Sequence, residues 1–218
     1  MKMKKILILL LSLTLSPTLL MAEEYSEGIE YTAYKKPFPV TTGDKIEVRE
    51  VFWYGCPHCF TLDAPLNKWR NEGIPADAEF IRMPAIFRDS WMVHARAYYA
   101  FESLDLTEEL HHAVMNAMHV KKQRLTTEDQ IADFVSTQGI DRKKFIDAYN
   151  SFSVDALSRQ AKIMTGRYGI KGVPSIVVDG RYLVTSTTAG GTEELFKVVN
   201  YLVQQAAEAR KNEKVEAK

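Results

Sequence analysis

The sequence predicts an α/β fold that is interrupted by an all-helical insertion. Strand patterns occur near both ends of the chain, and a helical pattern separates them from about residue 90 to residue 168. Neither group of strands can complete a sheet alone, so we expect the early and late strands to pair with each other. No low-complexity linker or internal repeat divides the chain after residue 22. The helical block is therefore an insertion into one α/β unit.

The first 22 residues have the layout of a secretory signal peptide. Three lysines precede an apolar run over residues 6–15, and the first acidic side chain is Glu23. We expect cleavage after Ala22; a retained membrane anchor is the alternative, because residues 6–22 are about as long as the shortest spanning helix. The exported chain would be slightly acidic, which gives no indication of nucleic-acid binding, and would reach a compartment where disulfides form.

A βαβ unit is expected next in the chain. Residues 45–54 alternate in polarity and then become apolar, as in a buried central strand. Pro57 opens a helical pattern directly after them, because proline suits the first helical turn, where an N–H would have no partner. Residues 78–83 have the pattern of a second strand. Cys56 therefore lies at a strand-to-helix junction.

The helical block contains its own start and stop signals. Thr107 precedes two glutamates that suit a first helical turn, and Thr127 is expected to form a capping box with Gln130. Gly139 is expected to end a helix. The last helix of the block should bury one apolar face, formed by Val154, Leu157, Ala161, Met164 and Tyr168.

A hairpin and a helix close the chain. Residues 174–184 contain two β-rich runs joined by Asp179-Gly180, which is a strong two-residue turn signal. Gly190-Gly191-Thr192 then opens an amphipathic helix. The predicted order is β, βαβ, helical insertion, ββ and α.

Both cysteines of the chain, Cys56 and Cys59, lie within one short window. A helix N-terminus carries partial positive charge and free N–H groups, which favour a thiolate. Cys56 should therefore be the exposed, reactive sulfur, and Cys59, one turn into the helix, the shielded resolving partner. A Cys-x-x-Cys pair beside a βαβ pattern indicates redox chemistry.

Two other roles compete for the cysteine pair, a structural disulfide and a zinc site. A structural disulfide would close so small a loop that it would remove little entropy from the unfolded chain. A zinc site needs about four ligands, and no second cysteine pair exists. The remaining candidate ligands are histidines, which we expect on helix surfaces or only partly packed: His94, His111, His112 and His119.

These features together resemble the DsbA family of bacterial periplasmic thiol:disulfide oxidoreductases. The resemblance rests on the signal peptide, the motif Cys56-Pro57-His58-Cys59, the helical insertion and the late Val173-Pro174 step. It implies a thioredoxin fold with an inserted all-helical domain. Residues 23–86 and 162–218 would form the thioredoxin-like domain, and residues 87–161 the insertion.

The resemblance also implies a cis peptide bond between Val173 and Pro174 that faces the cysteines. A cis proline has no N–H and exposes neighbouring backbone, so an extended substrate could pair beside the disulfide. Both residues are therefore candidates for substrate binding. From the residues alone, a trans proline that merely begins a strand is equally compatible.

Three charged residues are candidates for tuning the pair. Glu50 matches a family glutamate beneath the disulfide, where a buried carboxyl with a raised pKa could take or relay a proton at Cys59. Asp63 lies one turn beyond Cys59, where the family often carries an acid, and Arg82 stands in for a family lysine. Glu50 could instead face water at a strand edge. Arg82 cannot release its proton, which puts a relay through this position in doubt.

We therefore expect a periplasmic dithiol oxidase that donates a Cys56–Cys59 disulfide to reduced, newly secreted proteins. His58 can supply positive charge to the Cys56 thiolate, whereas Pro57 cannot. A stabilised thiolate stabilises the reduced enzyme, so the oxidised enzyme readily gives its disulfide away.

The resemblance implies reoxidation by a quinone-linked membrane partner of the DsbB type and no separate cofactor. We expect a monomer that binds no nucleic acid. A disulfide isomerase or reductase is one alternative, although no dimerisation domain is evident. A chaperone that holds clients without turnover is another, and it would survive Cys56→Ser, whereas an oxidase would not.

Overall fold

A five-stranded mixed sheet forms the centre of the protein. The computed structural model describes residues 25–216, so the predicted signal peptide lies outside the described residues. The strand order is β1-β5-β4-β2-β3, in which β2 and β3 are parallel and the other neighbouring pairs are antiparallel. Early and late strands share one sheet, which confirms the predicted fold class. The strands are β1 (Tyr31–Ala33), β2 (Ile46–Phe52), β3 (Ala78–Pro84), β4 (Ser175–Val178) and β5 (Tyr182–Val184).

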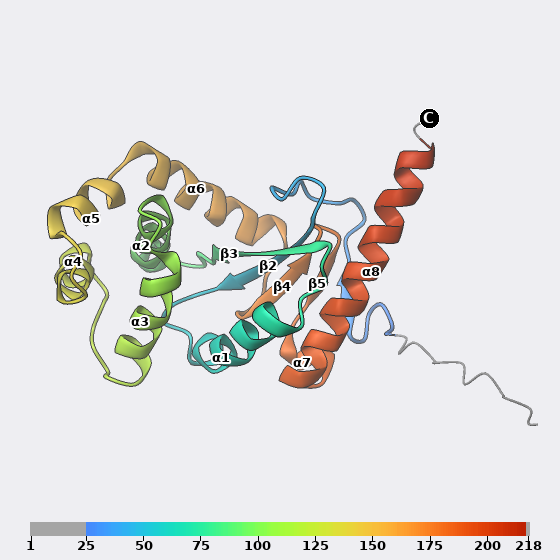
Figure 1. The fold of residues 1–218 in the computed structure, drawn as a ribbon, viewed down its shortest axis with the longest axis horizontal. Coiled ribbons are helices and arrows are strands. Elements are labelled where there is room, and N and C mark those ends of the chain that lie inside the picture. The colour runs from blue at the N-terminus through green and yellow to red at the C-terminus, as the bar shows by residue number, and fades with distance from the viewer. Residues whose placement is uncertain (1–24, 217–218) are drawn as a thin grey trace, which may run out of the picture.

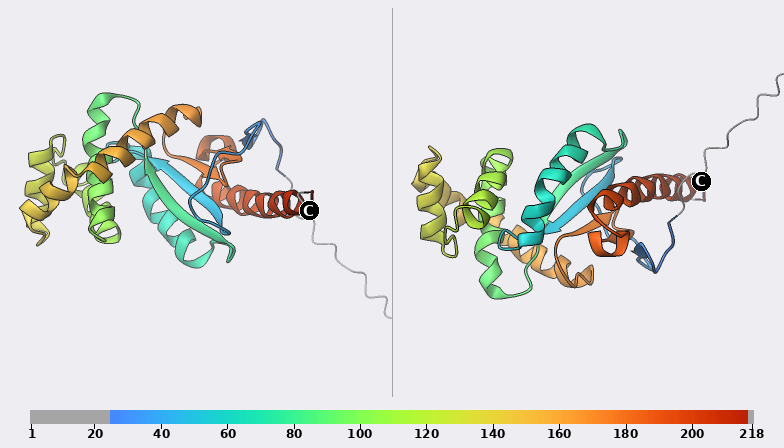
Figure 2. Two further views of the ribbon diagram at one scale, coloured as in Figure 1. Left: turned by 90° about the horizontal axis from the view of Figure 1, so that it is seen from above. Right: turned by 90° about the horizontal axis from the view of Figure 1, so that it is seen from below.

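Helices lie on both sides of this sheet, as Figure 2 shows for α1 and α6. α1 (Pro57–Glu72) and α8 (Thr192–Glu216) share one buried core with the sheet, which includes Leu66, Ile176 and Val199. The predicted βαβ unit is present as β2, α1 and β3. Pro57 is the first residue of α1, and Cys56 is its N-cap. The cysteine motif is therefore held at the end of a central strand.

The insertion gathers beyond that end of β2 (Figure 1). Its side chains form a second core with Phe52, Cys56 and Cys59, all of them buried. The packing of the insertion therefore bears directly on the cysteines. Within residues 25–216, no helix combines the length and the apolar character that crossing a bilayer requires. The insertion consists of α2 (Met92–Ser103), α3 (Thr107–His119), α4 (Glu128–Thr137), α5 (Arg142–Tyr149) and α6 (Phe152–Arg167).

The expected domain boundary between residues 161 and 162 falls inside α6. This helix runs without interruption from the insertion to the sheet, because it contacts α2 and α5 as well as β3. The buried face of α6 agrees with the expected one except at one position. Val154, Ala161 and Tyr168 are buried as expected. Leu157 is 38% exposed, and the neighbouring Ser158 is buried in its place.

The turn and cap signals are confirmed with one correction. The Thr127 side chain accepts a hydrogen bond from the Gln130 N–H, as an N-cap should. The predicted capping box is wrong. The Gln130 side chain accepts a hydrogen bond from the N–H of Thr126, whereas a capping box requires the N–H of the N-cap residue, Thr127. Gly139 follows α4 with a φ of +85°, a left-handed conformation in which glycine has no Cβ penalty.

The predicted hairpin turn joins β4 to β5. Asp179 and Gly180 both have positive φ, and the N–H of Arg181 donates to the carbonyl of Val178 over 2.8 Å. A side chain at Gly180 would not fit, because its Cβ would lie 2.3 Å from the carbonyl oxygen of Phe38. The short helix α7 (Ser186–Ala189) then leads into α8.

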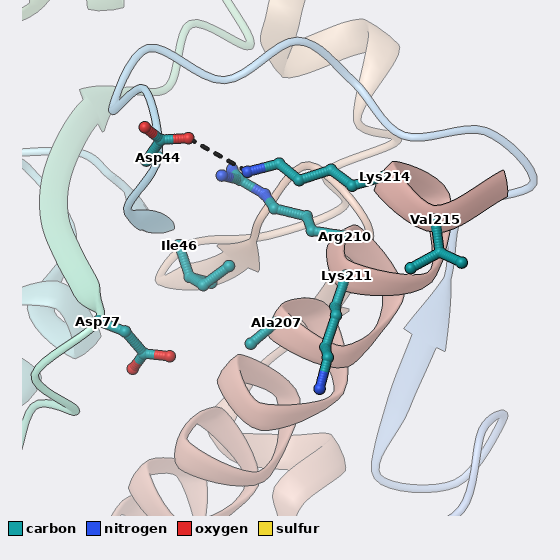
Figure 3. A pocket seen from close by; sticks show the side chains of 8 residues that line it. All are labelled: Asp44, Ile46, Asp77, Ala207, Arg210, Lys211, Lys214 and Val215. Carbon is teal, nitrogen blue, oxygen red and sulfur yellow. Dashed lines mark hydrogen bonds and ion pairs between the residues drawn. The ribbon is translucent and has the colours of Figure 1, made fainter. Parts of the chain in front are cut away.

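The C-terminal part of α8 is fastened to the start of β2. Arg210 binds the buried carboxylate of Asp179 and donates to the carbonyl of Gly43 over 2.9 Å. Lys214 pairs with Asp44 at 3.4 Å, as Figure 3 shows. The hollow that these side chains line lies at the opposite end of β2 from Cys56. These contacts serve to anchor the last helix.

Candidate active site

The two cysteines have opposite acid–base character. Cys56 is 7% exposed and Cys59 is 0% exposed, and both are free thiols in the structure. A hydrogen bond from Cys59 is the largest cause that lowers the pKa of Cys56 from 9.0 to about 6. The backbone N–H groups of Cys59 and His58 at the start of α1 and the charge of His58 lower it further, while burial opposes them. Burial raises the pKa of Cys59 far above its ordinary value.

The loop that precedes β4 covers the Cys56 sulfur. The Val173–Pro174 peptide bond is cis, as the resemblance implied. The Cys56 thiol lies 3.3 Å from the carbonyl oxygen of Val173, within hydrogen-bond distance for sulfur. This cover makes Cys56 less exposed than we expected from its position at a helix start. Beside it lies a groove of about 740 Å³, lined by His58, Thr61, Pro174 and the segment 185–188 among others.

Glu50 is buried beneath the two cysteines and forms an ion pair with Arg82. Glu50 is 1% exposed, so the alternative of a strand-edge glutamate facing water is wrong. The Arg82 Nε donates to Glu50 Oε2 over 2.9 Å, and Arg82 Nη2 lies 3.5 Å from Asp63 Oδ1. Burial raises the pKa of Glu50, and Arg82 opposes that rise. The Glu50 charge in turn adds to the raised pKa of Cys59, which places the two groups in electrostatic contact.

Two histidines of α3 complete the surroundings of Asp63. His112 Nδ1 lies 2.9 Å from Asp63 Oδ2, and His111 Nε2 lies 3.3 Å from Asp63 Oδ1. Burial lowers the pKa of His111 to about 4, so its ring is neutral at pH 7. Although burial of Asp63 works in the other direction, these histidines and Arg82 hold the pKa of Asp63 well below its usual range. The α3 helix therefore closes the charged cluster from outside the sheet domain.

The expectation that the four candidate histidines lie on surfaces or are partly packed is wrong for two of them. His94 and His111 are each 3% exposed. His119 is partly buried and its Nε2 lies 2.7 Å from the carbonyl oxygen of Tyr54. Sequence reasoning did not assign any of them to the site. The sequence held one signal that could have pointed to α3: this helix carries three of the five histidines of the chain.

The arrangement can exchange a disulfide. A thiolate at Cys56 can act as the leaving or attacking group, while Cys59 lies behind it, shielded from solvent, and can form or release the disulfide bond with Cys56. A thioredoxin-type sheet that holds a Cys-x-x-Cys pair at the first turn of α1, opposite a cis proline, defines the class of thiol:disulfide oxidoreductases.

Comparison with known proteins gives the family. Residues 79–203 match the DSBA-like thioredoxin domain family. The thiol:disulfide interchange protein DsbA of Pseudomonas aeruginosa is 39% identical over 190 residues, which cover 87% of this chain and 90% of that protein. The DsbA of Burkholderia cepacia is 38% identical over 95% of this chain and 100% of that protein. The chain belongs to the DsbA family.

A solved structure supports the same assignment. The crystal structure of Pseudomonas aeruginosa DsbA superposes with a TM-score of 0.80 at 39% identity, and the alignment covers 86% of this chain and 97% of that chain. The protein is thus a thiol:disulfide oxidoreductase with the thioredoxin fold and helical insertion of that family.

Proposed function

We propose that this protein is a periplasmic dithiol oxidase that donates a Cys56–Cys59 disulfide to newly secreted proteins. The observation that carries the proposal is the placement of the two thiols: Cys56 is the N-cap of α1 beside the cis Val173–Pro174 bond, and Cys59 is fully buried behind it. This placement lowers the pKa of Cys56 to about 6 and raises that of Cys59. A stabilised Cys56 thiolate favours the reduced enzyme, so the oxidised enzyme passes its disulfide to clients.

The reaction consists of two exchanges. A client thiolate attacks Cys56 Sγ, the Cys56–Cys59 bond breaks, and Cys59 leaves with the electron pair and takes up a proton. A second client thiolate then attacks the client sulfur of the mixed disulfide and releases Cys56 as a thiolate. The client loses two electrons and the enzyme gains them. Reoxidation would fall to a quinone-linked membrane partner of the DsbB type, and no separate cofactor is needed.

The neighbouring residues have distinct proposed roles. His58 adds positive charge near Cys56, and Pro57 begins α1 without an N–H that would need a partner. Glu50 would accept or supply the proton that Cys59 exchanges, because no solvent reaches that sulfur. The carbonyl of Val173, next to Pro174, would pair with an extended client segment lying in the groove.

Redox equilibration tests the proposal. The purified protein is equilibrated with a series of glutathione ratios, and the fraction reduced is read by alkylation and mass. An oxidase should stay largely reduced under conditions that oxidise a structural disulfide, and the oxidised protein should convert a reduced, unfolded client to its disulfide form in stoichiometric amounts. Cys56→Ser should abolish this conversion. Client protection that persists in Cys56→Ser would indicate a chaperone, and a strongly reducing potential would indicate a reductase.

A further inference from the structure

Trp53 connects the helical insertion to both cysteines. Its carbonyl oxygen accepts the N–H of Cys56 over 3.0 Å. The backbone N–H of Trp53 faces Cys59. It lowers the pKa of that thiol and so opposes the larger effect of burial, which raises it. The indole ring lies against Gly55, so closely that a Cβ on Gly55 would be 2.4 Å from the ring. The backbone and the ring of Trp53 therefore both contact the segment that presents Cys56.

The insertion holds this indole on two sides. The Trp53 Nε1–H donates to Nδ1 of His94 over 2.9 Å. The ring also stacks on Trp91, with centroids 3.8 Å apart and planes inclined by 5°. Both partners lie at the start of the insertion, and His94 is 41 residues from Trp53 in the chain.

The tautomer of His94 leaves Nδ1 free to accept the hydrogen bond from Trp53. Its Nε2 lies 2.6 Å from the carbonyl oxygen of Leu125, so Nε2 carries the hydrogen and Nδ1 is left to accept from Trp53. Burial lowers the pKa of His94, which keeps the ring neutral. Because both nitrogens of this buried ring are hydrogen-bonded, the ring is held in one orientation, and its bond to Nε1 fixes the indole of Trp53.

We propose that His94 is a positioning residue for the redox pair: by fixing Trp53, it holds the Trp53–Cys56 segment in the path that stabilises the Cys56 thiolate. This role rests on the proposed function, because it concerns the reactivity of the same cysteine. His94 touches neither sulfur and acts only through Trp53. Loss of the bond frees the indole to tilt away from Gly55, and the N–H groups of α1 then meet the Cys56 sulfur in a less favourable geometry.

Two substitutions of His94 separate the two ends of its ring. His94→Asn keeps an acceptor near the place of Nδ1, and His94→Gln keeps a donor near the place of Nε2 but offers Trp53 nothing. Trp53→Phe removes the same bond from the other side while keeping a ring to stack on Trp91. It gives the measurement if His94→Gln does not fold.

The chain offers a matched control. The Trp69 Nε1–H donates to Oδ1 of Asn200 over 3.0 Å, which is a second partly buried indole bond to a side-chain acceptor. It joins α1 to α8, away from the insertion. Asn200→Leu should cost comparable stability without touching the Trp53 segment.

The Cys56 pKa is measured in each reduced variant from the ultraviolet absorbance of the thiolate, together with the glutathione equilibrium. His94→Gln and Trp53→Phe should each raise the Cys56 pKa by up to about one unit, since one net hydrogen bond corresponds to about a tenfold change. The two together should raise it no further. His94→Asn and Asn200→Leu should leave it unchanged.

The outcomes distinguish this inference from the proposed function. An ordinary Cys56 pKa in the unsubstituted protein would overturn both. A low pKa that stays the same in folded His94→Gln and Trp53→Phe would overturn the role of His94 alone. An equal rise in Asn200→Leu would show a general loss of stability, and would also overturn it.

Discussion

The stability of the reduced protein should depend on pH through Cys56. Its pKa is lowered from 9.0 to about 6 in the folded, reduced state. A depressed folded pKa contributes stability that is fully present above the unfolded pKa and is lost as the pH falls through the folded pKa. The free energy of unfolding should therefore rise with pH across the window between these two values. The oxidised form has no thiol to ionise and lacks this dependence.

The size of the effect follows from the shift, since one pKa unit corresponds to about 1.4 kcal/mol. The Cys56 thiolate should contribute about 1.4 kcal/mol at pH 7 and about 2.7 kcal/mol at pH 8, and solvent screening at the protein surface lowers both by roughly a third. Closing the short disulfide loop adds a contribution to the oxidised form that does not depend on pH. The pH dependence of the difference between the two forms therefore comes from the thiols of the reduced form.

Cys59 limits the effect at alkaline pH. Because burial raises its pKa, Cys59 stays protonated in the folded protein after the thiols of the unfolded chain have ionised. A raised thiol pKa destabilises the folded state above the unfolded pKa, so this contribution opposes that of Cys56 there. The advantage of the reduced form should therefore stop growing above about pH 9.

Urea unfolding of both redox forms at several pH values between 5.5 and 8.5 measures the difference. The free energy of unfolding of the reduced form, minus that of the oxidised form, should rise by about 1 kcal/mol per pH unit between pH 6.5 and pH 8.5. The Cys56→Ser variant should follow the pH profile of the oxidised form. A difference that stays constant or falls with rising pH would refute the reasoning that a Cys56 thiolate stabilises the reduced protein.

One labelling experiment and two substitutions probe the site further. Brief alkylation of the reduced protein near pH 6.5 should label Cys56 almost alone, because Cys59 is buried and protonated; equal labelling in a peptide map would contradict this assignment. Glu50→Gln should lower the free energy of unfolding by about 1–3 kcal/mol in urea, because Arg82 keeps only its weaker contacts; an unchanged midpoint would argue against a tight pair. Asp63→Asn should flatten the loss of stability below pH 4, since the depressed pKa of Asp63 stabilises the folded state only above that range; an identical acid limb would exclude this contribution.

The local geometry of the site could be read from the sequence because it depends on few neighbouring residues. Pro57 suits the first turn of a helix, where its missing N–H needs no partner, so the position of Cys56 at the helix start follows from one dipeptide. The turn at Asp179-Gly180 needs positive φ at both residues, which few other pairs adopt. The apolar neighbours of Glu50 placed it in a buried strand, but they did not identify Arg82 as its ion-pair partner.

The resemblance supplied what local rules could not. From the residues alone, a cis and a trans bond before Pro174 were equally compatible, because the isomer depends on contacts with the segment that faces it. The structure has the cis bond, with the Val173 carbonyl 3.3 Å from the Cys56 sulfur. These residues lie more than a hundred positions from Cys56 in the chain, and only the pairing of β2 with β4 brings them together.

Only the tertiary structure decided which side chains of the insertion meet the active-site segment. Asp63 is contacted by His111 and His112, and Trp53 by His94, over separations of 41 to 49 residues. The helical period predicts which residues share one face of α2 or α3, but it carries no information about the side chains that the face will contact. Those contacts depend on the angle and register at which the insertion packs against β2 and α1. Many side chains set these together, and no short stretch of sequence encodes them.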